Sequence, residues 1–273
     1  MIAFLFLSYG DIVHIDLWRR YFAACRADTD TTADTAVWIH RADGIESSAF
    51  DGAHVIPSRP TSWGTYSLVE AHLQLIRHAA GADSYVLVSG DSIPVQPLEA
   101  LKADLRNDSW IDWERKGPYC GPPRNPFATR DEITYWAIRG HDRRATTVNA
   151  EAIPPHWNWV WHKASQWCVL SAHHASLLCD NETIIASIFR DSVIPDEHVV
   201  PTVLHALLGD LSSVRRRSAM FSNFAEATLP CPVEHHCVPV TYHMSNIARG
   251  IGDALAQHCH FLRKVCSTVA LTQ

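Results

Sequence analysis

The sequence has 273 residues, of which 47% are hydrophobic and 19% are charged, and its formal net charge is −6 at pH 7. This composition is typical of a folded globular protein and excludes a disordered or fibrous chain. The negative charge argues against a general attraction to nucleic acid or to an anionic membrane surface. Ten Trp and seventeen His are the unusual features, and indole rings offer flat faces on which sugars and bases can stack.

Strand-like and helix-like segments alternate through the first hundred residues. Residues 2–7 form an apolar run that predicts a buried strand, because the run is too short for a membrane span and lacks the basic flank of a signal peptide. Apolar residues at helical spacing predict a helix over residues 12–24. The same patterns predict strands at residues 36–40, 54–57 and 84–89 and a helix at residues 65–80. This βαβαβ order predicts an α/β protein with a doubly wound, largely parallel sheet that binds ligands at the carboxyl ends of its strands.

Residues 112–165 differ from the first hundred, since they are rich in Pro, Trp, Arg and Tyr and show weak periodicity. We expect long loops here, laid over one edge of the sheet, and so many aromatic residues argue against disorder. Helices are predicted again at residues 173–190, 197–208 and 246–260. Without a repeat or a low-complexity tract, the sequence predicts one domain over residues 1–273, with halves 1–110 and 111–273.

The cysteines and the remaining apolar segments bear on the compartment. The eight Cys include no CxxC pair, and with no secretory signal we interpret them as free thiols in a reducing compartment. No segment reaches the roughly 18–20 apolar residues that a membrane helix needs. We therefore expect a cytoplasmic protein without a membrane anchor.

The segment VIPDEHVVPT, residues 193–202, combines two carboxylates and an imidazole after a proline. Asp196 is predicted to cap a helix, which places Glu197 in the first turn, where the helix dipole favours an ionised carboxylate. A carboxylate held ionised beside a cleft is suited to act as a general base. The alternative interpretation of these residues is an ordinary capped helix on the surface.

A set of motifs spans almost the whole chain in a fixed order. After the N-terminal apolar strand they are VWIH (37–40), RPTSWG (59–64) with SLV (67–69), LVSGDSIP (87–94), ASQWCVL (164–170) and PDEH (195–198), with weaker matches at RSAMF (217–221) and FLRK (261–264). Together they resemble the core 2/I-branching β-1,6-N-acetylglucosaminyltransferase family, which includes protein xylosyltransferases and a plant and microbial branch. The plant and microbial branch is the more similar.

The resemblance implies an inverting glycosyltransferase with a GT-A-type fold, a single Rossmann-like domain whose mostly parallel twisted sheet is flanked by helices. Such an enzyme moves GlcNAc or xylose from a UDP-sugar to a hydroxyl of a glycan or glycoprotein acceptor. The family's catalytic base maps onto Glu197, and His198 is a candidate to orient it. Because the family is metal-independent, no cofactor is expected beyond the UDP-sugar co-substrate, and basic side chains would neutralise the diphosphate. Lys264 matches that position, and the run Arg215-Arg216-Arg217 is an alternative source of charge.

The resemblance also divides the site between the two halves, with nucleotide-sugar binding in residues 1–110 and acceptor binding and catalysis in residues 111–273. The predicted donor-binding residues are His40, Arg59, Trp63, Ser89, Gly90, Asp91, Arg249, Arg263 and Lys264. The predicted acceptor-binding residues are Trp157, Trp159, Lys163, Gln166, Trp167, Asp196 and Phe221. Trp157, Trp159 and Trp161 alternate, so in an extended segment they share one face that either stacks sugars or covers the sheet.

Several other functions and sites compete with this hypothesis. A glycoside hydrolase needs two carboxylates that flank a bond, which the neighbours Asp196 and Glu197 cannot do. A metallohydrolase is suggested by His173-His174 and by EHHC (234–237), but neither has the spacing of a helical zinc motif. The one DxD, residues 28–30, is interpreted as a solvated loop. A catalytically silent module that binds UDP-sugar or glycan stays open. Because the anchor and stem of the animal enzymes are missing, we expect a bacterial or virus-infected cytoplasm.

Overall fold

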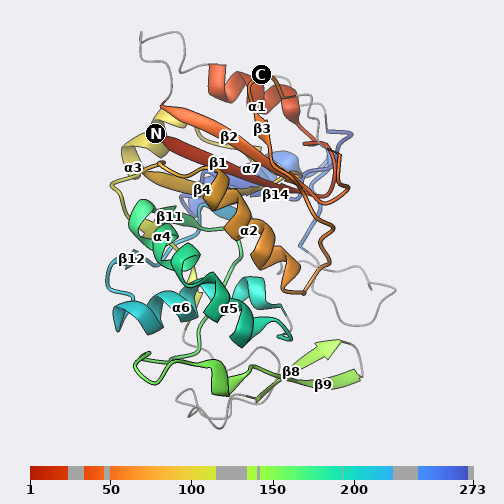
Figure 1. The fold of residues 1–273 in the computed structure, drawn as a ribbon. Helices are drawn as coiled ribbons and strands as arrows, with labels where there is room; N and C mark the ends of the chain where they lie inside the picture. Colours follow the sequence, from red (N-terminus) through yellow and green to blue (C-terminus); the bar gives the residue numbers. More distant parts are fainter. Residues whose placement is uncertain are drawn as a thin grey trace.

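The computed structural model describes residues 1–23, 34–45, 50–114, 134–139, 142–192, 194–223 and 239–269. Its centre is a seven-stranded sheet in the order β12-β6-β11-β4-β1-β2-β3 (Figure 1). All of its strand pairs are parallel except those of β11, which runs antiparallel to β4 and β6. The bounds are β1 (Ile2–Ser8), β2 (Thr35–Arg41), β3 (His54–Val55), β4 (Ser84–Ser89), β6 (Ser109–Trp110), β11 (Val169–Ser171) and β12 (Val214–Arg215). The predicted α/β class with a mostly parallel sheet is confirmed.

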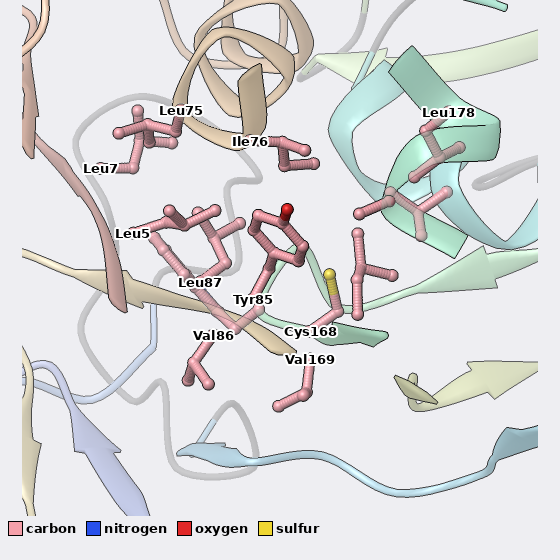
Figure 2. Close-up of a cluster of buried hydrophobic side chains, with 14 of the residues drawn as sticks. Leu5, Leu7, Leu75, Ile76, Tyr85, Val86, Leu87, Cys168, Val169 and Leu178 are labelled. Atoms are coloured by element: carbon pink, nitrogen blue, oxygen red, sulfur yellow. The ribbon is translucent and has the colours of Figure 1, made fainter. Parts of the chain in front are cut away.

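The central strand β1 is buried on both faces, and alternate side chains enter two different cores. Phe4 and Phe6 contact Trp18 of α1 (Ile15–Ala23), with ring centroids 6.4 and 4.9 Å apart. Leu5 and Leu7 point instead toward α2 (Ser67–His78), as Figure 2 shows. Burial on both faces explains why the strand reads as a continuous apolar run in the sequence.

Helices cover both faces of the sheet. α2, α4 (Ala172–Asp180), α5 (Glu182–Phe189) and α6 (Val199–Leu208) pack together beside β4 and β11 (Figure 1). On the side of α1 lies a second sheet, in the order β13-β14-β5, against which α7 packs. Its elements are β5 (Ile93–Pro94), β13 (Met220–Ser222), α7 (Ile247–Ala256) and β14 (Phe261–Arg263). No helix in the described ranges has both the length and the apolarity to span a membrane.

Several predicted elements differ in their bounds. The helix predicted over 173–190 is two helices, because Asn181 leaves the helical conformation and its side-chain amide donates to the carbonyl of Leu177 (2.8 Å). The helix predicted over 197–208 begins at Val199, after a short 3₁₀ turn, η3 (Pro195–Glu197). The helix predicted over 246–260 ends at Ala256, and the chain then enters β14.

The region predicted to be only loops, residues 112–165, contains regular structure where it is described. Two strands form a hairpin of their own, apart from the main sheet (Figure 1). Their antiparallel pairing is local, so it needs none of the amphipathic periodicity that marks a strand on a core. The elements between β5 and β11 are α3 (Leu98–Asp104), β6, β7 (Trp113–Glu114), β8 (Thr134–Arg139), β9 (Asp142–Thr147), η2 (Ala150–Ala152) and β10 (Lys163–Ala164).

Candidate active site

Ser89, Gly90 and Asp91 form a tight turn at the carboxyl end of β4. This turn lies against Ser8, at the carboxyl end of β1. A Cβ at Gly90 would overlap Ser8 Oγ and lie 2.7 Å from Ser8 Cβ, so only glycine allows the two strand ends to approach this closely. The Ser89 hydroxyl donates a hydrogen bond to the Asp91 carboxylate. The carbonyl of Gly90 accepts the N–H of Val13 (2.9 Å). The three predicted residues therefore form one rigid turn at the ligand-binding edge of the sheet.

A segment from the C-terminal part of the chain docks onto this turn. The N–H of Val265 donates to the carbonyl of Asp91 (2.9 Å), and Arg263 Nε lies 3.6 Å from Asp91 Oδ1. The Arg263 guanidinium lies over the Trp167 ring, 4.7 Å from its centroid. Burial lowers the pKa of Arg263, and the carboxylate of Asp91 acts against that change. Lys264 continues this segment, and its carbonyl accepts the N–H of Tyr242 (2.8 Å).

Residues 163–167 form a segment that contacts both Arg263 and Glu197. Because β11 runs antiparallel to β4, the residues that precede β11 lie beside those that follow β4. At one end of the segment Lys163 Nζ lies 3.4 Å from Glu197 Oε2, and at the other end Trp167 lies under Arg263. One segment of five residues thus contacts Glu197 at one end and Arg263 at the other, two residues that the sequence separates widely.

Glu197 ends η3, and the backbone around it is tightly constrained. Ile194 has φ +53°, a left-handed conformation that is rare for a β-branched residue and costs roughly 1–2 kcal/mol. Its N–H donates to the carbonyl of Gly64 (2.9 Å), which ties η3 to the loop before α2. Burial raises the pKa of Glu197 above its ordinary value, and the charge of Lys163 and its hydrogen bond offset only part of that rise.

The predicted cap role of Asp196 is wrong, because α6 begins at Val199 with His198 as its N-cap residue. The Asp196 side chain instead lines a small cavity between α2, α4 and α6, together with Gln166 and His72. Asp196 Oδ1 and Gln166 Nε2 are buried and have no hydrogen-bond partner among the described residues. Burial, together with the charge of Glu197, raises the pKa of Asp196 to about 7. Asp196 and Gln166, both predicted to bind acceptor, therefore face this internal cavity.

The predicted donor residues near β2 are not equally accessible. His40 is completely buried, and its Nε2 accepts the N–H of Arg59 (3.3 Å). The ring can therefore act on a ligand only through the position of Arg59, whose side chain is exposed. Trp63 is 56% exposed, next to the glycine that holds η3, and offers an indole face to solvent.

An ion-pair cluster at the ends of β1 and β2 was missed at the level of sequence. The Arg41 side chain is only 5% exposed and pairs with both Asp11 and Asp43. Its Nη2 lies 2.7 Å from Asp43 Oδ2, and the hydrogen bond to Arg41 lowers the pKa of that carboxyl. The available signal was the position of these charged residues immediately after two predicted strands.

Of two predicted acceptor residues, Trp157 is buried in the core, and Trp159 is partly buried and packs against it. Trp157 is 6% exposed, and Trp159 packs with Trp161 against Phe189 of α5, at centroid distances of 5.8 and 5.9 Å. Trp159 and Trp161 therefore cover helix α5, which is one of the two roles that the sequence left open for this row of indoles.

Two more predicted site residues belong to the smaller sheet and to the helix that packs against it. Phe221 of β13, predicted to bind acceptor, is buried with Ile93 and Leu262 in the smaller core. Arg249, predicted to bind donor, lies on α7 with its Nε 3.8 Å from the Asp253 carboxylate. Phe221 therefore serves the packing of this sheet, and Arg249 forms an ion pair within its own helix.

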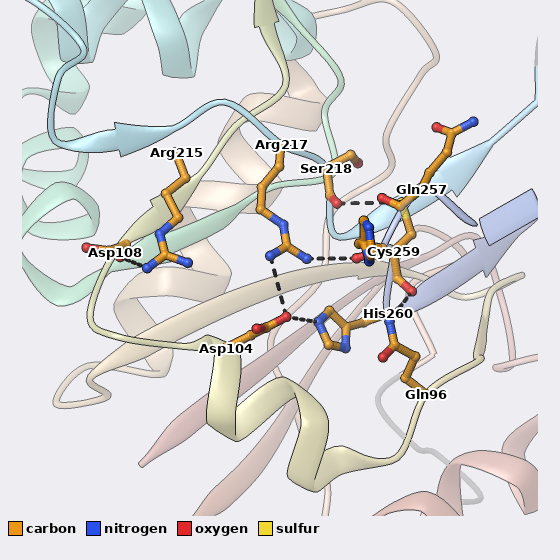
Figure 3. A network of polar contacts seen from close by, with 10 residues as sticks. Gln96, Asp104, Asp108, Arg215, Arg217, Ser218, Gln257, Cys259 and His260 are labelled. Atoms are coloured by element: carbon orange, nitrogen blue, oxygen red, sulfur yellow. Dashed lines mark hydrogen bonds and ion pairs between the residues drawn. The ribbon is translucent and has the colours of Figure 1, made fainter. Parts of the chain in front are cut away.

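Two arginines of the run that begins in β12 are held in ion pairs. Arg215 pairs with Asp108 (2.7 Å), and Arg217 with Asp104 (3.4 Å). Asp104 also contacts His260 Nε2 at 3.0 Å (Figure 3). Arg217 therefore fastens the entry to β14, and Arg215 fastens the start of β6.

The predicted metal-site motifs give no metal centre in the described ranges. Both DTD (28–30) and EHHC (234–237) lie outside the described residues. His174 is instead hydrogen-bonded to Ser109 Oγ (2.7 Å). Among the described residues, no group of three or more His, Cys, Asp or Glu side chains is placed to hold a metal ion. The described cysteines Cys168, Cys179, Cys259 and Cys266 are free thiols.

Comparison with known proteins gives matches over most of the chain. The model of the Core-2/I-Branching enzyme family matches residues 2–253. "Glycosyltransferase BC10" of Oryza sativa subsp. japonica is 23% identical over 90% of this chain, which spans 63% of that protein's length. A solved structure of an active-site mutant of LgtC aligns with a TM-score of 0.40 and 12% identity, covering 94% of this chain and 95% of that chain.

Proposed function

This chain belongs to the Core-2/I-Branching enzyme family, and we propose that it is an inverting glycosyltransferase that moves a sugar from a UDP-sugar to a hydroxyl of a glycan acceptor. GlcNAc and xylose are the proposed sugars. The observation that supports this most directly is the placement of Glu197. Its partly buried carboxylate pairs with Lys163, and Lys163 begins the segment whose Trp167 contacts Arg263.

Glu197 is the proposed general base. An acceptor hydroxyl attacks the anomeric carbon as the Glu197 carboxylate takes its proton, while the bond from that carbon to the diphosphate oxygen breaks on the opposite side. The base must be ionised at the start of this step. The ion pair with Lys163 favours the ionised form in a site where burial alone would favour the acid.

Arg263 and Lys264 are the proposed partners of the departing diphosphate. A guanidinium binds phosphate oxygens in a fork geometry, and Trp167 and Asp91 hold this one in place before any ligand arrives. The Asp91 carboxylate is already engaged by Arg263 and by the Ser89 hydroxyl. These contacts support the proposal that a cationic side chain, and not a divalent metal, serves the diphosphate.

The nucleoside is proposed to lie at the ends of β1 and β2. Asp11 and Asp43, fixed by Arg41, present acceptors suited to ribose hydroxyls or a base N–H. The exposed ring of Tyr9, 82% accessible, follows β1 at the same edge and is available for stacking on a base.

The test is to measure UDP-sugar turnover, including hydrolysis, for the wild type and for E197Q, each with and without EDTA. We expect the wild-type activity to survive EDTA and E197Q to lose at least about 10²-fold. E99Q, at an exposed carboxylate of α3, is the matched control. Full activity of E197Q would refute the base assignment, and loss in EDTA would refute the metal-free one.

A catalytically silent UDP-sugar- or glycan-binding module is the second candidate, favoured if the wild type binds but does not turn over. A thermal-shift series with UDP-GlcNAc, UDP-xylose, UDP-glucose and a GDP-sugar would identify the donor, because a ligand that binds only the folded chain raises Tm. A shift without turnover by any donor and acceptor would select this candidate.

A further inference from the structure

Two neighbouring contacts join the chain around Lys163 to the chain around Glu197. Lys163 Nζ lies 3.4 Å from Glu197 Oε2, and His198 Nδ1 lies 2.8 Å from the carbonyl of His162. Because each contact uses consecutive residues on both sides, the two segments are fixed at two points. We propose that Lys163 and His198 are positioning residues that hold the Glu197 carboxylate ionised and correctly oriented. This inference rests on the proposed function of Glu197.

The chemistry of His198 makes it a fixed hydrogen-bond donor. A carbonyl can only accept, so Nδ1 of His198 must bear the proton. The ring is completely buried, with its centroid 4.7 Å from that of Trp161, and burial lowers its pKa to about 4. At neutral pH the ring is therefore uncharged, and it contributes a hydrogen bond without adding a second cation beside Glu197.

We call the two contacts Lys163–Glu197 and His198–His162 the clamp. On the side of Lys163, the neighbouring residue His162 is anchored on α6. The N–H of His162 donates to Thr202 Oγ1 (3.1 Å), and its ring Nε2 lies 3.0 Å from His205 Nδ1. His162, the residue before Lys163, is thus held by hydrogen bonds from α6 and from its N-cap residue His198. Because these contacts fix the backbone next to Lys163, its ammonium group can reach few positions, and in one of them it pairs with Glu197.

Lys163 is the cation that favours ionised Glu197 among the charged groups around it. Asp196, on the same turn, carries a carboxyl that shares a cavity with His72 of α2. Across the β7–β10 pair, Glu114 lies opposite Lys163. Burial raises the pKa of Glu197, and Lys163 is the group that lowers it. Removing the ammonium should therefore leave Glu197 protonated at a higher pH.

This role differs from the predicted contact of Lys163 with acceptor, and the two give different kinetics. A positioning role predicts that K163M moves the acid limb of the pH profile of kcat/KM to higher pH by about one unit. At a pH below the limb, kcat/KM of K163M should then be about tenfold lower than that of the wild type. The limb should move equally for hydrolysis of the UDP-sugar, in which water is the acceptor. K163R should restore it. An acceptor-binding role predicts a raised acceptor KM with an unchanged limb.

The experiment measures donor hydrolysis and transfer from pH 5 to 9 for the wild type, K163M, K163R, H198N and H198L. K102M, which removes a lysine 3.3 Å from Glu99 on α3, is the matched control. H198N retains a donor at the position of Nδ1 and should keep most of kcat, whereas H198L should lower kcat with little change in donor KM. An unmoved limb in K163M, or equal kcat in H198N and H198L, would overturn the proposal.

A second readout does not depend on turnover. NMR titration of Glu197 with ¹³C-labelled carboxylates should show a higher pKa in K163M than in the wild type and K163R. If E197Q retained full activity while this pKa moved, the proposed base would be wrong and the clamp correct. If the pKa did not move, the clamp would be wrong whatever the activity of E197Q.

Discussion

The buried carboxyl of Asp196 makes the stability of the chain depend on pH in a direction that can be predicted. Its folded-state pKa is raised from 3.8 to about 7 by burial and by the charge of Glu197. The folded chain therefore binds the proton more tightly than the unfolded chain between these two values. Since the unfolded state then holds fewer protons, stability falls as pH rises from about 4 to about 7. Asn is isosteric and cannot ionise, so D196N removes this loss.

The magnitude follows from the same pKa change. Each pKa unit corresponds to 1.36 kcal/mol, so ionising Asp196 in the folded chain costs at most about 4 kcal/mol. Water entering the cavity that Asp196 and Gln166 line would reduce this cost. We therefore expect the free energy of unfolding of D196N, relative to the wild type, to increase by about 2–4 kcal/mol between pH 4.5 and pH 8.

Urea unfolding followed by tryptophan fluorescence at several pH values measures this difference. D51N, at an exposed carboxyl in the turn before β3, is the control substitution. In an E197Q background the pH-dependent gain should be smaller, because one cause of the raised pKa is gone. A difference between D196N and the wild type that is constant from pH 4.5 to 8 would refute the reasoning.

Three further substitutions test the site from other sides. G90A should destabilise by about 1–3 kcal/mol in urea unfolding, because its Cβ would overlap Ser8; adding S8G should recover most of the loss, and no recovery would contradict the clash. R263K keeps a charge but loses the planar contact with Trp167, so titration calorimetry should show about tenfold weaker UDP binding, and unchanged affinity would remove Arg263 from the donor site. W157F should lower Tm and leave the acceptor KM unchanged, since Trp157 is buried; a raised acceptor KM without loss of stability would restore it to the acceptor surface.

The elements of the first hundred residues could be predicted because local pattern and tertiary environment agree there. Residues 84–89 read as a strand buried on both faces, and β4 has those bounds. The helix predicted over 65–80 is α2, trimmed at both ends. By contrast, residues 169–171 form a central strand that is too short to show a period, and its place between β4 and β6 is fixed by pairing with distant residues.

The site residues divide in the same way. Ser89, Gly90 and Asp91 follow a predicted strand, so their place at the ligand-binding edge follows from chain order. The stacking of Arg263 on Trp167 joins residues almost a hundred positions apart, and no local pattern reports such a pair. The burial of the tryptophan side chains could not be predicted from the sequence either. An alternating row of tryptophans is compatible with a sugar-binding surface and with a core surface until the residues that pack against it are known.

The sequence by itself determined the α/β class, the order of the elements up to β4 and the identity of Glu197 as the carboxylate to test first. Those conclusions depend on periodicity and on short motifs, which a linear chain displays directly. Only the tertiary structure decided what surrounds that carboxylate. The side chain of Asp196 faces a cavity, Lys163 forms an ion pair with Glu197, and His198 donates a hydrogen bond to the carbonyl of His162. The physical reason is that ionisation depends on burial and on charges within a few ångströms, and the folded chain brings those groups from distant positions.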